Sequence, residues 1–247
     1  MTFNQSEFNI KLEWGLPGIE QLAPVSDVII IVDVLSYSTC VDIAVSNGAI
    51  IYPYKYKDDS SVDYAKSLRA ELANRDRSSS GYTLSPVSLK NIPTGTMLVL
   101  PSPNGATLSL ATGNVTTICG GLRNAKAVAE YAMSTGKNVS VIPAGERWQD
   151  QYESKGTIRF TIEDLIGAGA IIYFLKGSLS PESKSALAVY ESVKDNLPEE
   201  IKKCSSGKEL IERGFEDDVN LACELNVSEC VPVLKDKAYR NVIQTSL

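Results

Sequence analysis

An acidic residue, Asp33, ends a run of β-branched residues over 29–32 and precedes a short polar loop over 36–39. Apolar positions then recur at helical spacing as far as Asn47 and Gly48. A strand, a polar turn and a helix start in this order present backbone N–H groups and a helix dipole to an anion. An acid at the end of the strand could hold a hard metal ion such as Mg²⁺ beside that anion. The segment therefore predicts a site for phosphate and a divalent ion, although an ordinary buried strand with a Ser/Thr helix cap has the same pattern.

Acidic residues recur at three further places that suit acid–base or metal chemistry. They are Glu146 after a predicted strand, Glu163 and Asp164 at one helix start, and Asp217 and Asp218 at another. Acids in a first helical turn also interact favourably with the helix dipole, by about 0.3–1 kcal/mol, without any catalytic role. Asp33 differs, because a carboxylate among Ile, Val and Leu loses much hydration unless it is paired or bound to a metal. We select Asp33, Glu163 and Asp164 as catalytic candidates, and Asp33, Glu146 and Asp218 as metal ligands.

The candidates for binding an anion lie in two loops and among the arginines. The loops are LSYST over 35–39 and SPNGA over 102–106, and the arginines are Arg123, Arg147 and Arg159. Arginine binds phosphate, carboxylate or sulfonate through two parallel hydrogen bonds. Pro-Asn-Gly is also a common turn, and Arg147 beside Glu146 could be a solvated charge. The residues selected for substrate binding are Ser36, Ser38, Thr39, Asn104, Gly105, Arg123 and Arg147.

The chain contains no histidine, which excludes several kinds of chemistry. Ser-His-Asp and Cys-His catalysis are absent, as are zinc sites with histidine ligands. Acid–base or metal chemistry must therefore use carboxylates, Lys, Arg, Tyr, Cys or bound water. Cys40 follows the polar loop, but it has no histidine to activate it, and we expect a small buried residue there.

Composition and charge limit the partners that we expect. The 247 residues are 43% hydrophobic and 22% charged, which suffices for a sizeable core. A net charge of −6 and the lack of a Lys/Arg block argue against nucleic acid and against acidic membranes. Five cysteines without CxxC spacing, no signal-peptide pattern and no bilayer-length apolar run predict a cytoplasmic protein with reduced thiols. The expected partner is a small phosphorylated metabolite, and a homodimer is left open.

A weak internal repeat indicates the fold class. Residues 29–50 align with 94–115, and each copy reads as strand, polar loop, helix, glycine and strand. A looser third copy starts at residues 138–148, with its helix beginning near residue 161. Such units predict an α/β fold with a largely parallel or mixed sheet and helices on both faces. The loops after the strands should lie at one edge of the sheet, where ligands normally bind.

Two lobes are one reading of the domain organisation. We expect an α/β core over residues 1–176 and a C-terminal helical or α/β lobe over 177–247, unless the two form one continuous domain. Residues 58–77 have the pattern of an amphipathic helix with a polar face, and a Ser/Gly/Pro-rich loop follows over 78–89. Ser180 as cap and Pro181 at the first helical position predict a further helix as far as residue 197.

Six segments together resemble a known family. In chain order they are VDVLSYSTCVDIAVSNGA, SPNGA, LRNAKAVA, PAGERW, FTIEDLIGAGAII and GFEDDVNLACELNVSECVP. They resemble segments of the 2-phosphosulfolactate phosphatase family over about residues 27–240. The resemblance implies an unusual α/β fold and magnesium-dependent hydrolysis of a phosphate ester. The family's substrate is 2-phosphosulfolactate, and the product, sulfolactate, belongs to coenzyme M synthesis.

Individual positions follow the family's motifs or depart from them. Those that match are Asp33, Thr39, Asn104, Gly105, Gly145, Glu163, Asp164 and Asp218. The departures are Ser36 in place of an arginine, Ser102 and Pro103 in place of two threonines, and Pro143 in place of a cysteine. The change at Ser36 removes a fixed positive charge from the expected anion site.

Two functions fit these observations. The leading hypothesis is a Mg²⁺-dependent phosphatase acting on a small acidic phosphate ester, with Glu163 as the base that acts on water. The alternative is a non-catalytic phosphometabolite-binding protein of the same fold, which the loss of the arginine at Ser36 favours. Unless Arg123, Arg147 or Arg159 reaches into the same space, we expect weak hydrolysis of 2-phosphosulfolactate.

Overall fold

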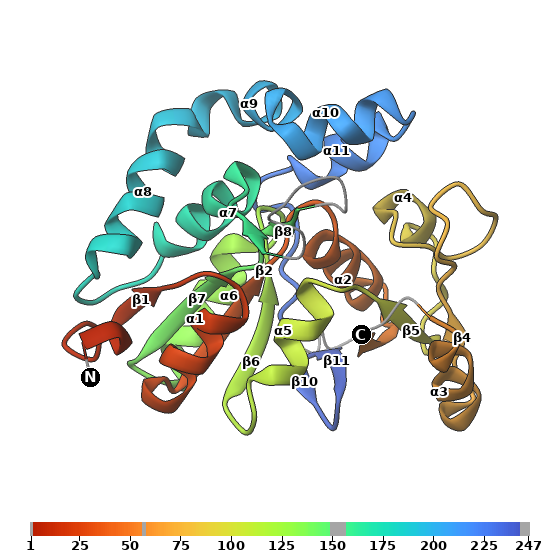
Figure 1. Ribbon diagram of the computed structural model, residues 1–247, viewed down its shortest axis with the longest axis horizontal. Coiled ribbons are helices and arrows are strands. Elements are labelled where there is room, and N and C mark those ends of the chain that lie inside the picture. The colour runs from red at the N-terminus through yellow and green to blue at the C-terminus, as the bar shows by residue number, and fades with distance from the viewer. Residues whose placement is uncertain (1, 56–57, 149–156, 243–247) are drawn as a thin grey trace.

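One large sheet with helices on both faces forms the frame of the protein (Figure 1). The computed structural model describes residues 2–55, 58–148 and 157–242. The sheet has the strand order β1-β7-β2-β6-β10-β11-β3-β5-β4, and β8 pairs separately with β9. The strands are β1 (Ile10–Leu12), β2 (Val28–Val32), β3 (Ile50–Tyr54), β4 (Glu71–Leu72), β5 (Met97–Pro101), β6 (Thr116–Gly120), β7 (Val139–Pro143), β8 (Glu146–Arg147), β9 (Ile158–Arg159), β10 (Pro232–Lys235) and β11 (Ala238–Asn241).

The helices alternate with strands as far as α7 and then follow one another. They are α1 (Gly15–Leu22), α2 (Tyr37–Ser46), α3 (Ser60–Leu68), α4 (Pro86–Leu89), α5 (Gly105–Ala111), α6 (Ala125–Thr135), α7 (Ile162–Ile172), α8 (Pro181–Val193), α9 (Leu197–Lys203), α10 (Ser205–Glu212) and α11 (Glu216–Ala222). The predicted cap of α8 is confirmed, because the Ser180 hydroxyl accepts a hydrogen bond from the Ser183 N–H over 3.1 Å. The strand-loop-helix units at β2–α2 and β5–α5 occur where the repeat predicts them.

Strand β2 is covered on both faces, as its unbroken run of Val and Ile requires. Val28, Ile30 and Val32 pack in the core that contains residues of α6 and α7. Ile29 and Ile31 point the other way, into a core with residues of α1. The alternation fixes the register of β2, and Asp33 follows directly after its last residue.

The sheet consists of two parallel halves that run in opposite directions. Strands β1, β7, β2 and β6 are mutually parallel, and so are β3, β5 and β4. The hairpin β10–β11 joins them through antiparallel pairs with β6 and β3. The fold class is therefore confirmed as a mixed sheet, in which the C-terminal hairpin lies between the two halves. A domain boundary near residue 176 stays a prediction.

The opposed halves change the reason why the loops after β2 and β5 meet. These strands are not at one edge of a parallel sheet, as the repeat predicted, because three antiparallel pairs separate them. Each strand is rotated by about 20–25° relative to its neighbour, and this rotation accumulates over the steps from β2 to β5. It turns the two opposed strand directions toward each other until they are less than about 80° apart. The loops that follow the two strands meet where the Gly105 N–H donates a hydrogen bond to Asp33 Oδ2.

The prediction of one helix over residues 58–77 is wrong. Helix α3 ends at Leu68, because Arg69 adopts the left-handed conformation with φ 53°. The chain then enters the edge strand β4, where Glu71 pairs with Leu98 and Leu72 with Val99. Residues 73–85 form an extended loop that reaches back over the carboxyl end of β2. In the part of the chain that the structure describes, no helix is long and apolar enough to cross a membrane.

Candidate active site

A pocket of about 830 Å³ lies where the loops after β2 and β5 meet. The loop over 73–85, the strands β8 and β9 and the helix α10 close it from other sides. Its described lining residues are Asp33, Leu35, Ser36, Arg75, Asp76, Arg77, Leu84, Ser102, Pro103, Asn104, Glu146, Arg147, Trp148, Arg159, Ser205, Ser206, Glu209, Leu210 and Arg213. The loops after β2 and β5 therefore line one cleft, although their strands do not lie at one edge of a parallel sheet.

Asp33 lies in the wall of this pocket with 7% of its surface exposed. Its Oδ1 accepts a hydrogen bond from the Tyr37 N–H over 3.2 Å, and its Oδ2 accepts one from the Gly105 N–H over 3.0 Å. Burial raises the pKa of Asp33 to about 6, and the charges of Glu146 and Glu163 add to this effect. Among the described residues no Lys or Arg forms an ion pair with Asp33.

The polar residues of the loop after β2 divide into two groups. Ser38 and Thr39 are buried and bond to the loop itself: Ser38 Oγ accepts from the Asp33 N–H over 2.7 Å, and Thr39 Oγ1 donates to the Val34 carbonyl over 2.8 Å. They fix the backbone around Asp33 and do not line the described pocket. Ser36 does line it, and its hydroxyl accepts from the guanidinium of Arg77 over 3.2 Å.

Asn104 and Glu146 line the pocket close to Asp33. Asn104 Nδ2 donates to Glu146 Oε1 over 2.9 Å, and the N–H of Arg147 donates to the same oxygen over 2.7 Å. Gly105 begins α5, and its N–H is the donor that reaches Asp33. These contacts hold one oxygen of Glu146, while its other oxygen, Oε2, has no contact among those described.

Glu163 and Asp164 are buried in the first turn of α7 and do not line the described pocket. Asp164 Oδ1 accepts from the Val34 N–H over 2.7 Å, and its Oδ2 accepts from the Gly145 N–H and the Thr161 hydroxyl over 2.9 and 2.8 Å. Asp164 therefore ties the loop after β2 to the loop after β7. Burial raises its pKa well above the ordinary value.

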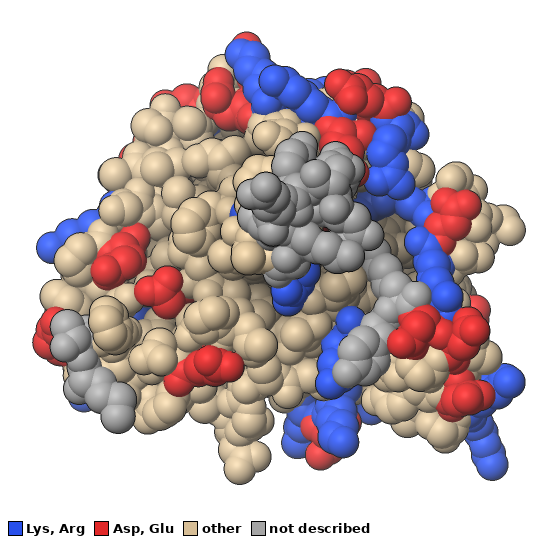
Figure 2. All heavy atoms as spheres, in the orientation of Figure 1, with Lys and Arg blue, Asp and Glu red and all other residues tan. Residues whose placement is uncertain are grey.

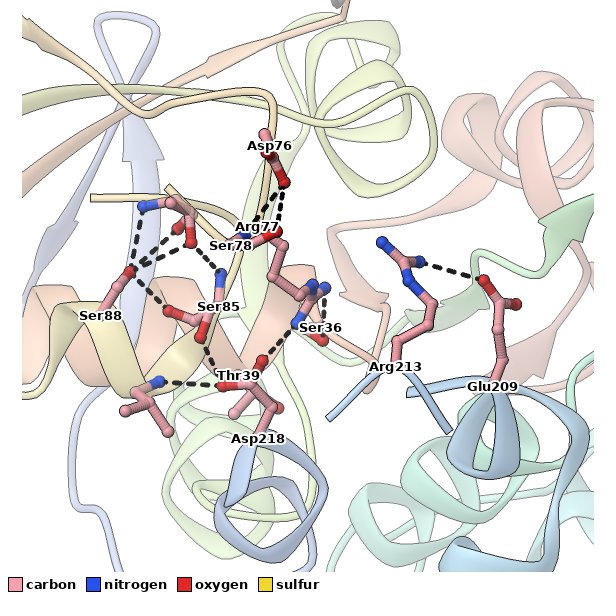
Figure 3. Close-up of polar contacts among 12 residues, drawn as sticks. Ser36, Thr39, Asp76, Arg77, Ser78, Ser85, Ser88, Glu209, Arg213 and Asp218 are labelled. Atoms are coloured by element: carbon pink, nitrogen blue, oxygen red, sulfur yellow. Dashed lines mark hydrogen bonds and ion pairs between the residues drawn. The ribbon is translucent and has the colours of Figure 1, made fainter. Parts of the chain in front are cut away.

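Asp218 lies on the far side of the pocket wall, at the start of α11, and is paired with Arg77 (Figure 3). Its Oδ2 accepts from Arg77 Nη1 over 2.5 Å, and its Oδ1 accepts from Ser85 Oγ over 2.5 Å and from the Val87 N–H over 3.2 Å. Asp218 was expected to bind metal with Asp33 and Glu146. In residues 2–55, 58–148 and 157–242, no three Asp, Glu or Cys side chains group closely enough to form a metal site.

The structure places Arg123 away from the pocket, in a separate buried network. Its Nε donates to Asp42 Oδ2 over 2.9 Å, and its Nη1 donates to Glu224 and to the Leu221 carbonyl. Ser228 holds the other oxygen of Asp42. With these contacts made, Arg123 joins α2 to the C-terminal helices, and it is no longer a candidate for substrate binding.

Arginine dominates the cations at the pocket, and sequence reasoning missed three of these residues. Arg147 and Arg159 line it as expected, and Arg75, Arg77 and Arg213 join them. Figure 2 shows Lys and Arg side chains gathered between the C-terminal helices α10 and α11 and the region of α4. Arg75 and Arg77 were not predicted to lie at the site, because the pattern over 58–77 placed them on the solvent face of a helix.

The cysteines have no part in this site. All five lie in the described part of the chain and are free and buried. Burial raises the pKa of the Cys40 thiol well above its ordinary value, which is the reverse of what a thiolate nucleophile needs.

Comparison with known proteins supplies the family. The family described as 2-phosphosulpholactate phosphatase matches residues 18–237. The chain belongs to this family. A probable 2-phosphosulfolactate phosphatase of Carboxydothermus hydrogenoformans is 32% identical over 227 residues, which are 88% of this chain and 90% of that protein. The 2-phosphosulfolactate phosphatase of Methanothermobacter thermautotrophicus is 33% identical over 62% of each chain, and that of Methanocaldococcus jannaschii is 26% identical over 85% of this chain and 89% of its own.

Membership of the 2-phosphosulpholactate phosphatase family confirms the resemblance that the six segments indicated. The matched region contains every element that lines the pocket, from the loop after β2 to α10. Ser36 stands where the resemblance implies an arginine, and the guanidinium of Arg77 contacts that serine. A cation therefore lies at the expected place but comes from a different segment of the chain.

Proposed function

We propose that this protein hydrolyses 2-phosphosulfolactate to sulfolactate and inorganic phosphate, with Mg²⁺ bound at Asp33. The family and the names of its relatives support a phosphoric monoester hydrolase. The observation that carries the proposal is a buried carboxylate, Asp33, in the wall of a pocket that five arginines also line. An acidic phosphate ester needs both a group that holds a cation at the phosphoryl end and cations for its negative charge.

The residues around Asp33 fit a magnesium ion. A buried carboxylate without a cationic partner is costly, and the neighbouring charges of Glu146 and Glu163 increase that cost. Mg²⁺ characteristically uses one or two protein carboxylates and completes its shell with waters and substrate phosphate, so a cluster of three acids is not required. When bound, the ion supplies a Lewis acid that withdraws charge from the phosphoryl oxygens. We assign Asp33 as its ligand.

Glu146 is the carboxylate best placed to take a proton from the attacking water. Its Oε1 is held by Asn104 and by the N–H of Arg147, which leaves Oε2 for the water. The water oxygen forms a bond to phosphorus and its proton passes to Oε2. The bond from phosphorus to the ester oxygen breaks, and this oxygen leaves with sulfolactate and takes up a proton from solvent. Glu163, the base that the sequence favoured, is buried in α7 and does not line the described pocket.

The arginines supply the charge that the acid substrate requires. Arg147 and Arg159 stand beside Glu146 on β8 and β9, where a guanidinium can donate to equatorial phosphoryl oxygens as charge develops on them. Ser38, Thr39 and Asp164 act indirectly, because their hydrogen bonds set the backbone around Asp33. As part of the same proposal, the protein acts in the cytoplasm, supplies sulfolactate for coenzyme M synthesis and binds no nucleic acid.

Phosphate release decides between the enzyme and a non-catalytic binding protein. The full-length protein is incubated with 2-phosphosulfolactate and with p-nitrophenyl phosphate, in Mg²⁺ and in EDTA. We expect magnesium-dependent release of phosphate from both, with 2-phosphosulfolactate preferred. Tight calorimetric binding of 2-phosphosulfolactate without any release in Mg²⁺ would establish the binding protein instead.

A further inference from the structure

Two arginines from distant segments lie against the same aromatic ring at one side of the pocket. The guanidinium carbon of Arg77 is 5.4 Å from the centre of the Phe215 ring, and that of Arg213 is 5.6 Å from it. Both arginines line the pocket (Figure 3). The shared ring brings two cations together, although nothing in the reaction at Asp33 requires them on this side.

Buried contacts fix the side chain of Arg77, although this arginine lies in a loop. Its side chain is 12% exposed, and it is paired with Asp218, whose side chain is 1% exposed. Asp218 is fixed in turn by Ser85 and by the N–H of Val87. A guanidinium has five N–H donors, and the described contacts to Asp218 and Ser36 use two of them. The remaining donors are preorganised at the pocket.

Arg213 carries a charge that its own helix neutralises only weakly. It pairs with Glu209 one turn away over 3.2 Å, and both side chains are about half exposed, at 53% and 50%. Exposed pairs of this kind contribute little and exchange partners easily. An oxyanion entering the pocket can therefore replace Glu209 as the partner of Arg213.

Two groups of pocket residues suit different parts of an acidic substrate. Asp33, Glu146 and Asn104 form one group, where a cation is needed before an anion can approach. Arg77 and Arg213, which lie against the same Phe215 ring, form the other. A substrate with two acidic groups will place its phosphoryl group at Asp33 and its second oxyanion between the arginines.

We propose that Arg77 and Arg213 form a subsite for the non-phosphoryl oxyanion of the substrate, a sulfonate or a carboxylate on its carbon skeleton. This inference rests on the proposed phosphatase activity and adds the residues that set substrate choice. Asp218 is a positioning residue, because it acts through Arg77. A charge-assisted hydrogen bond lost at this subsite corresponds to about a tenfold to hundredfold loss in kcat/KM.

The test compares Arg213→Gln with the native protein on three substrates in Mg²⁺. They are 2-phosphosulfolactate, 2-phospholactate, which lacks the sulfonate, and p-nitrophenyl phosphate, which lacks both groups. We expect the loss in kcat/KM, mainly through KM, to be at least about tenfold larger for 2-phosphosulfolactate than for p-nitrophenyl phosphate. If 2-phospholactate shares the loss, the subsite binds the carboxylate; if it does not, the subsite binds the sulfonate.

Controls keep this outcome separate from folding and from the proposed function. Arg240→Gln, which changes an exposed arginine on β11 outside the pocket lining, is the matched control. Equal losses on all three substrates in Arg213→Gln would overturn the subsite. If the native protein hydrolyses none of them, the phosphatase proposal fails, and calorimetric titration with 2-phosphosulfolactate still tests the subsite. A Kd unchanged by Arg213→Gln would then overturn it.

Discussion

The backbone N–H of Gly105 donates a hydrogen bond to Asp33 Oδ2 over 3.0 Å and so joins the loops after β2 and β5. The two strands belong to opposed halves of the sheet. Helix α5 packs against one strand of each half, β2 and β3. The position of the acid in the pocket thus depends on how two separate βα units dock. Small changes at this contact should alter both stability and activity.

Gly105→Ala tests that contact directly. A Cβ at this position would overlap the ring of Tyr37 and lie 2.9 Å from Asp33 Oδ2. We expect the free energy of unfolding to fall by about 1–3 kcal/mol, since a buried position is overpacked, and kcat to fall with it. Urea unfolding and phosphate release measure the two effects. Gly121→Ala is the matched control, because its Cβ would meet Ser38 Cβ at an ordinary 3.5 Å. Native stability in Gly105→Ala would show that the loops can separate.

Separate substitutions distinguish the metal ligand from the base. Asp33→Asn should weaken Mg²⁺ binding at least tenfold by calorimetry, a loss of about 1.4 kcal/mol or more, because one negative ligand is removed. Glu146→Gln should lower kcat by about a hundredfold or more while the Mg²⁺ affinity changes little. Asp217→Asn, exposed in α11, serves as the control. Asp218→Asn should leave Mg²⁺ affinity unchanged, since Arg77 occupies that carboxylate. Equal Mg²⁺ affinity in native protein and Asp33→Asn would remove Asp33 from the metal site.

Stability should depend on pH through Asp33. Burial raises its pKa from 3.8 to about 6, so the folded protein keeps a proton that the unfolded chain has released. Its contribution to the free energy of unfolding is complete below pH 3.8 and is lost as the pH rises through about 6. In EDTA, Asp33→Asn should therefore gain stability relative to the native protein over this range.

Asp27 is the control for the pH dependence, because its pKa is shifted in the opposite direction from that of Asp33. Hydrogen bonds from the backbone N–H groups of Asn138 and Lys137 hold the pKa of Asp27 below its ordinary value. Its contribution is present above that value and is lost as the pH falls, so Asp27→Asn should lose stability relative to the native protein as the pH rises. Urea unfolding at several pH values measures both slopes. Parallel curves for native protein and Asp33→Asn would contradict the raised pKa.

Local pattern predicted the parts of the site that are close in sequence. The buried strand before Asp33, the helix after it and the turn at Asn104 all follow from periodicity and turn chemistry within about a dozen residues. The same reasoning placed Glu146 after a strand, where β8 holds it in the pocket wall. These features needed no information about how the units dock.

Contacts between segments far apart in the sequence determined where the other candidate residues lie. Arg77 reaches the pocket because β4 pairs with β5 and because Asp218, 141 residues later in the chain, receives its guanidinium. The sequence pattern over residues 58–77, with charged residues on one face, fitted a solvent-exposed helix equally well. Arg123 was misplaced for the same reason, since its partner Asp42 lies 81 residues earlier. Partners that are this far apart in the sequence produce no periodic pattern from which their contact could be predicted.

Ser36→Arg tests whether Arg77 has taken the place of the arginine that the resemblance implies at position 36. The guanidinium of Arg77 already contacts Ser36 Oγ, and Asp218 is paired with it, so a second arginine would meet a like charge. We expect Ser36→Arg alone to lower kcat/KM for 2-phosphosulfolactate, and Arg77→Ala alone to lower it further. In the double variant the new side chain should recover about tenfold or more of the loss in Arg77→Ala, because the cation returns to the same wall of the pocket. Strictly additive losses in this double-mutant cycle would show that the two positions serve different ends of the site.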